Sequence, residues 1–341
     1  MPRYARVDEP VRSPYFDEMS ELELLLFRQD NVISRRQALR HLSLDAIRHR
    51  LESGRWRQAV RGVYVAHSGP VTAEQRWMIA SLACGAGRRA PLAGVTALTI
   101  AGLRGYPAGV VHVLMPWHRR DRNAPYWVAV HRTRHLPASQ VHRLATPPYT
   151  LPARSLVDAA QWARDDDAAA ALVASAFQQR LVTADEVNSV LVDMPGIHRR
   201  RLIGAMVADV AGGSHSLPEL EFVHGCRREG LPEPSRQVRR DDSTGRRRYL
   251  DALFEPYGVH VEIDGAQHLE VRRYWADMQR QNDLWIPGER VLRFPAYIIR
   301  MRPDLWVPQL RKALIEAGWN PIVDRTMAVR PSSGPRSHRS Y

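Results

Sequence analysis

The sequence predicts a multidomain α/β protein of the mixed α+β type. Its 341 residues are enough for two or three domains. With 44% hydrophobic and 25% charged residues, the composition is that of a globular chain rather than a disordered one. Apolar residues recur at helical spacing in some segments and alternate with polar residues in others. This combination of periods indicates helices and short strands mixed along the chain.

Arginine dominates the charge of the chain. The 49 basic residues exceed the 36 acidic residues by 13, and Lys312 is the only lysine. The basic excess lies in residues 1–213 and in the tail 321–341, whereas residues 214–320 are nearly neutral. We interpret the tail, with its Pro331-Ser332-Ser333-Gly334-Pro335 stretch, as disordered. A chain this basic is expected to bind a polyanion.

Nothing in the sequence predicts membrane insertion or secretion. No apolar run approaches the roughly 20 residues that cross a bilayer. The first 23 residues contain six acidic residues, which is unlike a signal peptide. Two cysteines, Cys84 and Cys226, are too few for a disulfide framework or a cysteine-rich zinc site. We therefore expect a soluble, cytoplasmic protein without a membrane partner.

Residues 18–68 predict a winged helix-turn-helix. Ser34 can cap a short helix, and apolar residues at helical spacing predict a second helix over 44–52. Two short strand-like segments follow at 56–60 and 62–65, joined by a tight turn. In such a module the second helix enters the major groove of DNA, and the hairpin lies along the backbone.

Five arginines of this module are the candidate DNA-binding residues. They belong to the second helix and to the hairpin: Arg48, Arg50, Arg55, Arg57 and Arg61. A planar guanidinium can meet phosphate oxygens or a guanine edge through two hydrogen bonds at once. The alternative is a small helical domain whose arginines form a solvated charged face.

Residues 31–65 resemble the N-terminal domain of AbiEi-type antitoxins and related actinobacterial regulators. Members typically end this module in a Gly-x-Trp/Tyr and Arg-Gly-Val-Tyr pattern, matched here by Gly54, Trp56 and Arg61-Gly62-Val63-Tyr64. The resemblance implies a module that binds operator DNA, in a toxin-antitoxin setting with a cognate toxin as a candidate partner.

Residues 70–211 predict a mixed α/β region that also looks AbiEi-like, including Ala-Arg-Ser-Leu-Val-Asp at 153–158. A capping box at Thr72–Gln75 opens a helix that ends near Gly85. Further elements are expected as a helix over 91–103, strands at 110–115 and 127–132, and helices over 155–162, 166–179, 183–192 and 199–211.

The middle region shows no catalytic constellation. Its histidines do not fall in pairs on one helix face, so we expect them to be structural or exposed; they are His112, His118, His131, His135 and His142. Asp158 stands among apolar residues and is expected to be a buried polar anchor rather than a catalyst.

The candidate chemistry lies in residues 214–320. A helix over 219–229 and a strand over 236–240 precede two strands, 248–254 and 259–264, that flank a tight turn. If this hairpin closes symmetrically, Phe254 faces Val259 and Asp251 faces Glu262. One face is then apolar, because side chains alternate, and the other face carries Asp251, Glu262 and Asp264.

Three carboxylates on one patch need a compensating cation or raised pKa values. Mg²⁺ or Mn²⁺ would satisfy this need, because such hard cations prefer oxygen ligands. A divalent ion at a carboxylate cluster can activate water against a phosphodiester, which is nuclease chemistry. The alternative is a solvated acidic face without a metal.

The pattern Asp251, ten residues, then Glu262-x-Asp264-Gly265-x-Gln267-His268 is similar to the Vsr-like branch, of unknown function, in the PD-(D/E)XK nuclease superfamily. The resemblance runs from about 216 to 319. It implies a restriction-endonuclease-like three-layer α/β/α fold and a magnesium-dependent endonuclease, a hydrolase of phosphodiester bonds. It also implies Asp251 and Glu262 as metal ligands, with Asp264 as a third candidate.

Other positions of this pattern have two interpretations each. Glu219 matches the acidic residue of the superfamily's first helix, and it fits a capping box from Ser216 equally well. His268 suits a general base near neutral pH, and it also suits a helix cap. The helix expected over 269–285 exposes Arg273 and Arg280.

The chain departs from the superfamily at one catalytic position. Many members place a lysine two residues after the second carboxylate, where this sequence has Asp264. Gln267, His268 or an arginine would have to orient the water or stabilise the transition state. Two hypotheses follow: a DNA-binding protein with an active nuclease domain, or an AbiEi-like transcriptional regulator whose nuclease-like domain is inactive.

Overall fold

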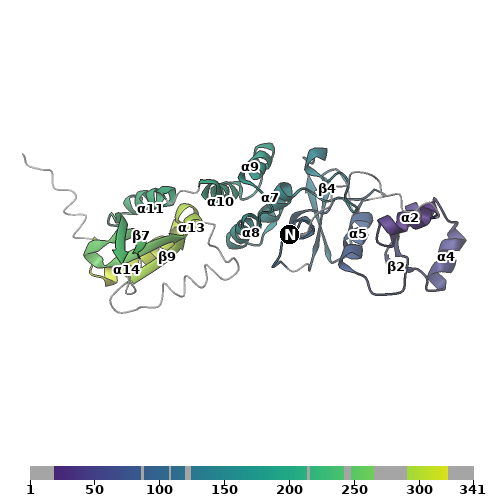
Figure 1. Ribbon diagram of the computed structural model, residues 1–341, viewed down its shortest axis with the longest axis horizontal. Coiled ribbons are helices and arrows are strands. Elements are labelled where there is room, and N and C mark those ends of the chain that lie inside the picture. Colours follow the sequence, from purple (N-terminus) through teal and green to yellow (C-terminus); the bar gives the residue numbers. More distant parts are fainter. Residues whose placement is uncertain are drawn as a thin grey trace, which may run out of the picture. The chain divides into compact units, whose positions relative to one another are not determined.

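Figure 1 shows the computed structural model of the chain, whose helices and strands confirm a mixed α+β protein. The structure describes residues 19–85, 88–106, 109–119, 124–212, 216–241, 247–264 and 290–321. They form two compact units: unit 1 is Met1–Trp162 with Leu181–Ile197, and unit 2 is Ala163–Arg180 with His198–Tyr341. Within the described ranges, every helix is too short or too polar to cross a bilayer.

The first part of unit 1 is a small sheet with helices. Its elements are α2 (Glu21–Arg28), β1 (Val32–Ser34), α3 (Arg35–Ala38), α4 (Leu44–Glu52), β2 (Arg57–Val60) and β3 (Val63–Val65). The three strands are antiparallel in the order β1-β3-β2. Helix α4 and the hairpin lie where the sequence predicts them, whereas the helix expected from Ser34 to Leu42 is shorter and ends at Ala38. The elements α2 and β1 were not predicted. Strand β1 has only three residues, all buried, so it carries no alternating pattern.

Both faces of this sheet are covered. Ile33 and Tyr64, which are paired across β1 and β3, pack against Ile47 of α4. Val32 and Val65 point to the other face and pack against Met78. Met78 belongs to α5 (Ala73–Cys84), which opens with the predicted capping box between Thr72 and Gln75. Because successive side chains of a strand alternate, three short strands can hold two separate cores.

The second part of unit 1 contains a two-stranded parallel sheet. Its elements are α6 (Gly94–Ile100), β4 (Val111–Pro116), β5 (Val128–Thr133), η1 (Ala138–Gln140), α7 (Pro152–Trp162) and α9 (Ala184–Asp193). The expected helix over 91–103 is shorter than predicted at both ends. Leu92 forms β-bridges with Val113 and Tyr149, which keeps the chain extended up to Gly94. Gly94 has a φ of 56°, and a side chain there would clash with Trp162.

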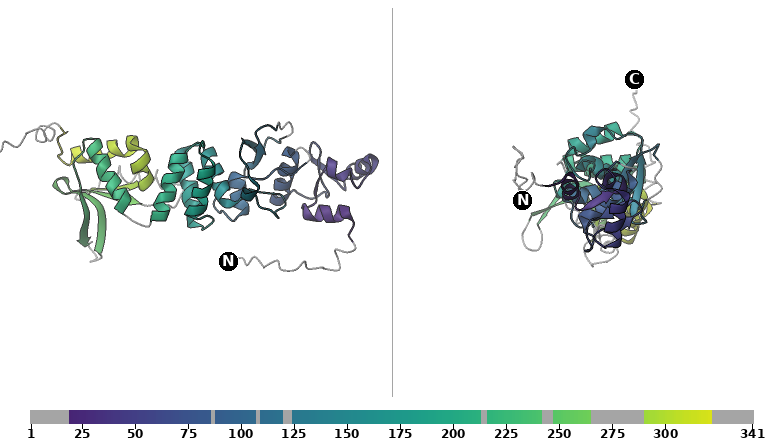
Figure 2. Two further views of the ribbon diagram at one scale, coloured as in Figure 1. Left: turned by 90° about the horizontal axis from the view of Figure 1, so that it is seen from above. Right: turned by 90° about the vertical axis from the view of Figure 1, so that its right-hand side faces the viewer.

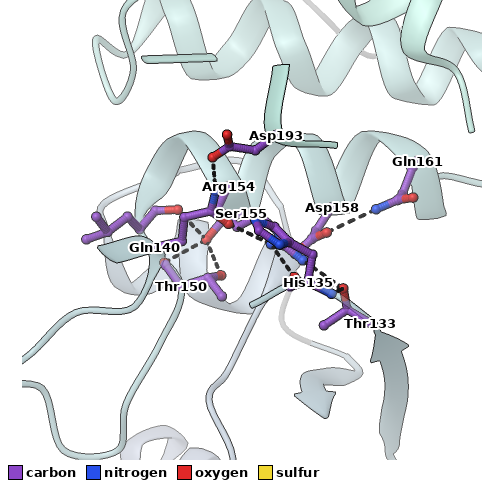
Figure 3. A network of polar contacts seen from close by, with 10 residues as sticks. Thr133, His135, Gln140, Thr150, Arg154, Ser155, Asp158, Gln161 and Asp193 are labelled. Atoms are coloured by element: carbon purple, nitrogen blue, oxygen red, sulfur yellow. Dashed lines mark hydrogen bonds and ion pairs between the residues drawn. The ribbon is translucent and has the colours of Figure 1, made fainter. Parts of the chain in front are cut away.

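A buried arginine joins the elements around this sheet (Figure 3). Arg154 of α7 is 1% exposed, and its Nε lies 2.9 Å from Oδ2 of Asp158 one turn later. Its Nη1 donates to the carbonyl oxygen of His135 (3.0 Å) and to Oε1 of Gln140 (2.6 Å). Gln140 in turn donates to Asp193 of α9 (3.0 Å). The expectation that Asp158 is a buried anchor is confirmed.

Unit 2 combines helices with a four-stranded sheet. Its elements are α8 (Asp166–Gln178), α10 (Arg200–Gly212), α11 (Ser216–Arg228), β6 (Ser235–Asp241), β7 (Arg247–Phe254), η2 (Glu255–Tyr257), β8 (Val259–Asp264), β9 (Arg290–Pro295), α13 (Ala296–Met301) and α14 (Pro303–Glu316). The strand order is β6-β7-β8-β9, with only β8 and β9 parallel among these pairs. Figure 2 shows helices α13 and α14 (yellow) beside the strands of this sheet (green).

Helix α8 belongs to unit 2, although the sequence groups it with residues 70–211. Arg199, just before α10, places its Nε 2.6 Å from Oδ1 of Asp166. The hydroxyl of Tyr297 in α13 donates to Oδ1 of Asp167 (3.1 Å). These contacts tie the start of α8 to α10 and α13, and periodicity along the chain does not reveal them.

Aromatic residues fill the core of unit 2 beside the hairpin. The rings of Phe222 and Trp306 are 5.2 Å apart, and Phe222 meets Phe254 edge-on at 6.4 Å. The pair Phe254–Val259 confirms the predicted register of the hairpin. The expected apolar face is confirmed as buried, but Leu253 and His260 on the opposite face are buried as well. The second face is therefore covered near the turn and is not acidic along its whole length.

We predict that Arg154→Met lowers the free energy of unfolding by about 3–5 kcal/mol, because it leaves the buried Asp158 carboxylate without its cation. The double variant Arg154→Met/Asp158→Leu should regain part of this loss. Urea unfolding followed by circular dichroism measures both. Arg48→Met, which breaks an exposed pair with Asp45, is the control and should cost less than about 1 kcal/mol. A loss of that small size for Arg154→Met would contradict the role of the buried pair.

Candidate nucleic-acid interface and candidate metal centre

Helix α4 presents a polar, charged face to solvent. Ser43 caps the helix, with its hydroxyl accepting from the amide of Ala46 (3.1 Å). Ile47 faces the core, so the residues one and two positions on, Arg48 and His49, point outward. The Arg48 side chain is 66% exposed and pairs only with Asp45, which is 86% exposed, at 2.9 Å among the described contacts. An exposed pair of this kind contributes little, so Arg48 is available to a ligand.

Two of the five candidate arginines are engaged within the protein. Arg50 donates from Nη1 to the carbonyl oxygen of Ala46 (3.2 Å), and its guanidinium lies 5.7 Å from the ring centre of Trp56. Arg57 donates to the carbonyl oxygen of Gly69, which ties β2 to the following loop. These bonds hold the hairpin in place, so both residues are better described as supports than as first contacts for DNA.

The other candidates lie at the hairpin and are exposed. Arg55 precedes β2, and Arg61 occupies the turn between β2 and β3. Gly62, next to Arg61, has a φ of 75°, a conformation that glycine adopts without strain. Sequence reasoning missed three further exposed arginines on α3 and directly after it: Arg35, Arg36 and Arg40. The only sequence signal for these three arginines was the density of arginine in the segment, because α3 is a single turn and too short to show helical periodicity.

The carboxylate positions of unit 2 meet on neighbouring strands. The observed pairs between β7 and β8 run from Phe254–Val259 to Ala252–Val261. Continued by one residue, this register sets the backbone of Asp251 opposite that of Glu262. Asp264 ends β8 and pairs with Pro295 of β9. The backbone therefore brings together the strand positions that the sequence singles out; the side chains of Asp251 and Asp264 lie outside the described part.

The side chain of Glu262 is described, and it has an arginine partner. Oε2 of Glu262 lies 2.7 Å from Nε of Arg293, the residue beside it on β9. Because β9 lies far along the chain from β8 and runs parallel to it, this partner cannot be read from local spacing. The pair supplies a positive charge next to the second carboxylate of the pattern.

The remaining candidates can be placed only in part. Glu219 falls in the first turn of α11, as expected, and its side chain is outside the described part. Gln267, His268, Arg273 and Arg280 all lie outside the described residues. Among the side chains that are described, no three metal-ligating residues converge.

The donor chemistry suits a hard cation. Asp251 and Glu262 would bring carboxylate oxygens from two adjacent strands, which is the kind of ligand that Mg²⁺ and Mn²⁺ prefer. Arg293 opposes this, because it neutralises Glu262 through a hydrogen-bonded ion pair. A cation at this place would have to share Glu262 with Arg293 or displace it.

Two histidines of the middle region lie in contact with each other across the β4–β5 pair. His112 of β4 and His131 of β5 lie with Nδ1 and Nε2 2.9 Å apart, and Trp162 stacks on His131 at a ring distance of 3.4 Å. Burial lowers the pKa of His112, and burial together with His112 lowers the pKa of His131 to about 4. The pair is therefore neutral at pH 7, in agreement with a structural role.

The chain matches no protein-family model, and no curated protein matches it either. Any assignment of function therefore depends on the residues and geometry of the chain itself.

We predict that the pair His112–His131 makes unit 1 sensitive to acid. The unfolded chain binds a proton on each histidine near pH 6.5, whereas folded His131 resists protonation until about pH 4. The free energy of unfolding is therefore at its full value above about pH 6.5 and decreases as the pH falls towards 4. His131→Gln should make this loss less steep in urea unfolding measured between pH 4 and 7. His118→Gln, at a position outside this pair, is the control; equal slopes for both variants would contradict the prediction.

Proposed function

We propose that the chain is a DNA-binding protein whose residues 18–68 form a winged helix-turn-helix. The observation that carries the proposal is the exposed arginine set on α4 and on the β2–β3 turn: Arg48, Arg55 and Arg61. In the proposed module these residues would belong to the second helix and the wing, the two parts that meet duplex DNA.

The order of elements supports this proposal. A helix, a strand, two helices and a hairpin follow one another, and the first strand joins the hairpin in one antiparallel sheet. Ile47 and Leu51 of α4 pack inward, so the inner face of the helix is buried and its outer face can enter a groove of the DNA. The proposed contacts combine groove entry by α4 with phosphate contacts by the hairpin.

We predict that Arg48→Gln and Arg61→Gln each weaken duplex binding at low salt. Each arginine that no longer reaches a phosphate should reduce the slope of log K against log salt by about 0.9. Fluorescence anisotropy of a labelled mixed-sequence duplex, titrated between about 50 and 200 mM salt, measures both effects. Arg164→Gln removes another exposed arginine, outside this module, and is the matched control. Equal losses of affinity in all three variants would reject α4 and the hairpin as the interface.

We propose further that residues 214–320 form a PD-(D/E)XK-like, magnesium-dependent endonuclease domain. The support is the hairpin register, which brings the backbone positions of Asp251 and Glu262 towards each other on neighbouring strands. These residues would hold the cation, with Asp264 as the third candidate. When bound, the cation would supply an activated water and stabilise charge on the phosphodiester. Arg293 would orient Glu262 through its 2.7 Å ion pair.

A second candidate is a transcriptional regulator, an AbiEi-like antitoxin, whose nuclease-like domain is inactive. The ion pair between Glu262 and Arg293 favours this candidate, because it satisfies the carboxylate without a metal. In that case the chain binds operator DNA through the N-terminal module, and binding survives chelation of divalent ions.

We predict that the full chain nicks supercoiled plasmid DNA in the presence of Mg²⁺ or Mn²⁺ and not in EDTA. Asp251→Asn and Glu262→Gln should each abolish nicking, because each removes one proposed ligand. Glu255→Gln changes an exposed carboxylate at the turn of the same hairpin and should leave the rate unchanged. Conversion of supercoiled to open-circular plasmid on a gel is the measurement. If neither wild type nor any of the three variants nicks the plasmid faster with Mg²⁺ or Mn²⁺ than in EDTA, the inactive-domain candidate stands.

A further inference from the structure

The largest excess of positive charge lies between the two proposed functional regions. Residues 75–157 hold 11 arginines and one acidic residue, Asp121. Residues 28–64, which include α4 and the hairpin, hold nine arginines and three acidic residues. The acidic residues of the middle region lie mostly beyond this stretch, since residues 158–211 hold eight acidic residues and five arginines. The local excess over 75–157 favours a polyanionic ligand.

Part of this charge gathers at one edge of the β4–β5 pair. Because the two strands are parallel, their carboxyl ends meet at the same edge. Trp117 and Arg119 follow β4, and Arg132 and Arg134 lie at the end of β5. The residues described in 111–119 and 124–135 include no acidic residue, so nothing in these two segments neutralises the edge.

An exposed tryptophan lies among these arginines. Trp117 is 59% exposed, which is unusual for the largest apolar side chain. The guanidinium carbon of Arg134 lies 5.6 Å from the centre of its ring, and the ring of His118 meets it edge-on at 6.2 Å. A cation beside an exposed indole offers a stacking surface and a phosphate partner within one nucleotide's reach.

Hydrogen bonds fix the backbone at this edge. The amide of Trp117 donates to the carbonyl oxygen of Thr133 (2.8 Å), which fixes the end of β4 to the end of β5. Arg154 bonds to the hydroxyl of Thr133 and to the carbonyl oxygen of His135, on both sides of Arg134. The side chains of Trp117 and Arg134 thus project from an ordered backbone, which reduces the entropy lost on binding.

We propose that this edge is a second nucleic-acid contact, which binds a single strand by stacking an unpaired base on Trp117 and pairing phosphates with Arg119 and Arg134. Arg132 supports the edge, since its Nε donates to the carbonyl oxygen of Arg119 (3.2 Å). A single strand is favoured over duplex DNA because bases inside a duplex hide their faces in the stack. An acidic protein would match the arginines but would leave the exposed ring without a specific partner. The contact is independent of the winged-helix proposal, since it uses other residues.

The test compares single-stranded and duplex binding by the full chain. The probes are a labelled oligothymidylate of about 20 nucleotides and a duplex of equal length, followed by fluorescence anisotropy. Trp117→Ala should weaken binding of the single strand about tenfold, the size expected for the loss of one stacked base. Trp117→Phe should retain most of the affinity, and Arg134→Gln should weaken it and lower its salt dependence.

Tyr126→Ala is the matched control, because Tyr126 is 99% exposed but precedes β5, at the opposite end of the strands. It should leave single-strand binding unchanged, and duplex binding should change less than about twofold in Trp117→Ala. Equal losses for single strand and duplex in Trp117→Ala would overturn the proposal, as would an unchanged affinity for the single strand. The same loss in Tyr126→Ala would also overturn the proposal. A labelled polyglutamate that binds as tightly as the oligonucleotide, and loses affinity equally in Trp117→Ala, would overturn it too.

Discussion

The middle of unit 1 depends on the ion pair and the hydrogen bonds of the buried Arg154 guanidinium. It neutralises Asp158 within α7, bonds to both sides of Arg134 after β5, and reaches α9 through Gln140. Burial raises the pKa of Asp158 to about 6, and Arg154 opposes that rise. A buried charge pair costs desolvation, so it persists where several other hydrogen bonds also satisfy its members. Here those bonds connect α7, η1, α9 and the segment after β5.

Apart from buried Arg154, the arginines of unit 1 that carry the proposals lie at its surface. Arg48 lies on helix α4, and others lie at turns and strand ends: Arg55 and Arg61 at the hairpin, and Arg119 and Arg134 after the parallel strands. Arginines that support the fold are satisfied by carbonyl oxygens, as Arg50 and Arg57 are. Carboxylates of unit 2 likewise pair with arginines of the same unit, as Glu262, Asp166 and Glu221 do.

Local patterns in the sequence predicted the helices with capping residues and the register of the β7–β8 hairpin, because both depend on neighbouring residues. They did not predict β1, which has meaning only through its pairing with β3. The chain also gave no local signal for the Glu262–Arg293 pair, for the His112–His131 contact, or for α8 joining unit 2, because each depends on segments distant in sequence. Of the candidate DNA-binding arginines, periodicity identified the segment but not which side chains are engaged within the fold. The metal ligands stay a prediction.

We propose that α4 and the β2–β3 hairpin form the surface that meets duplex DNA. Hydrogen exchange of the full chain, measured by mass spectrometry with and without a saturating mixed-sequence duplex, tests it directly. We expect slower exchange in peptides covering residues 44–65, and unchanged exchange in α9, which lies in the same unit. Unchanged exchange over 44–65, with protection elsewhere in the chain, would contradict it.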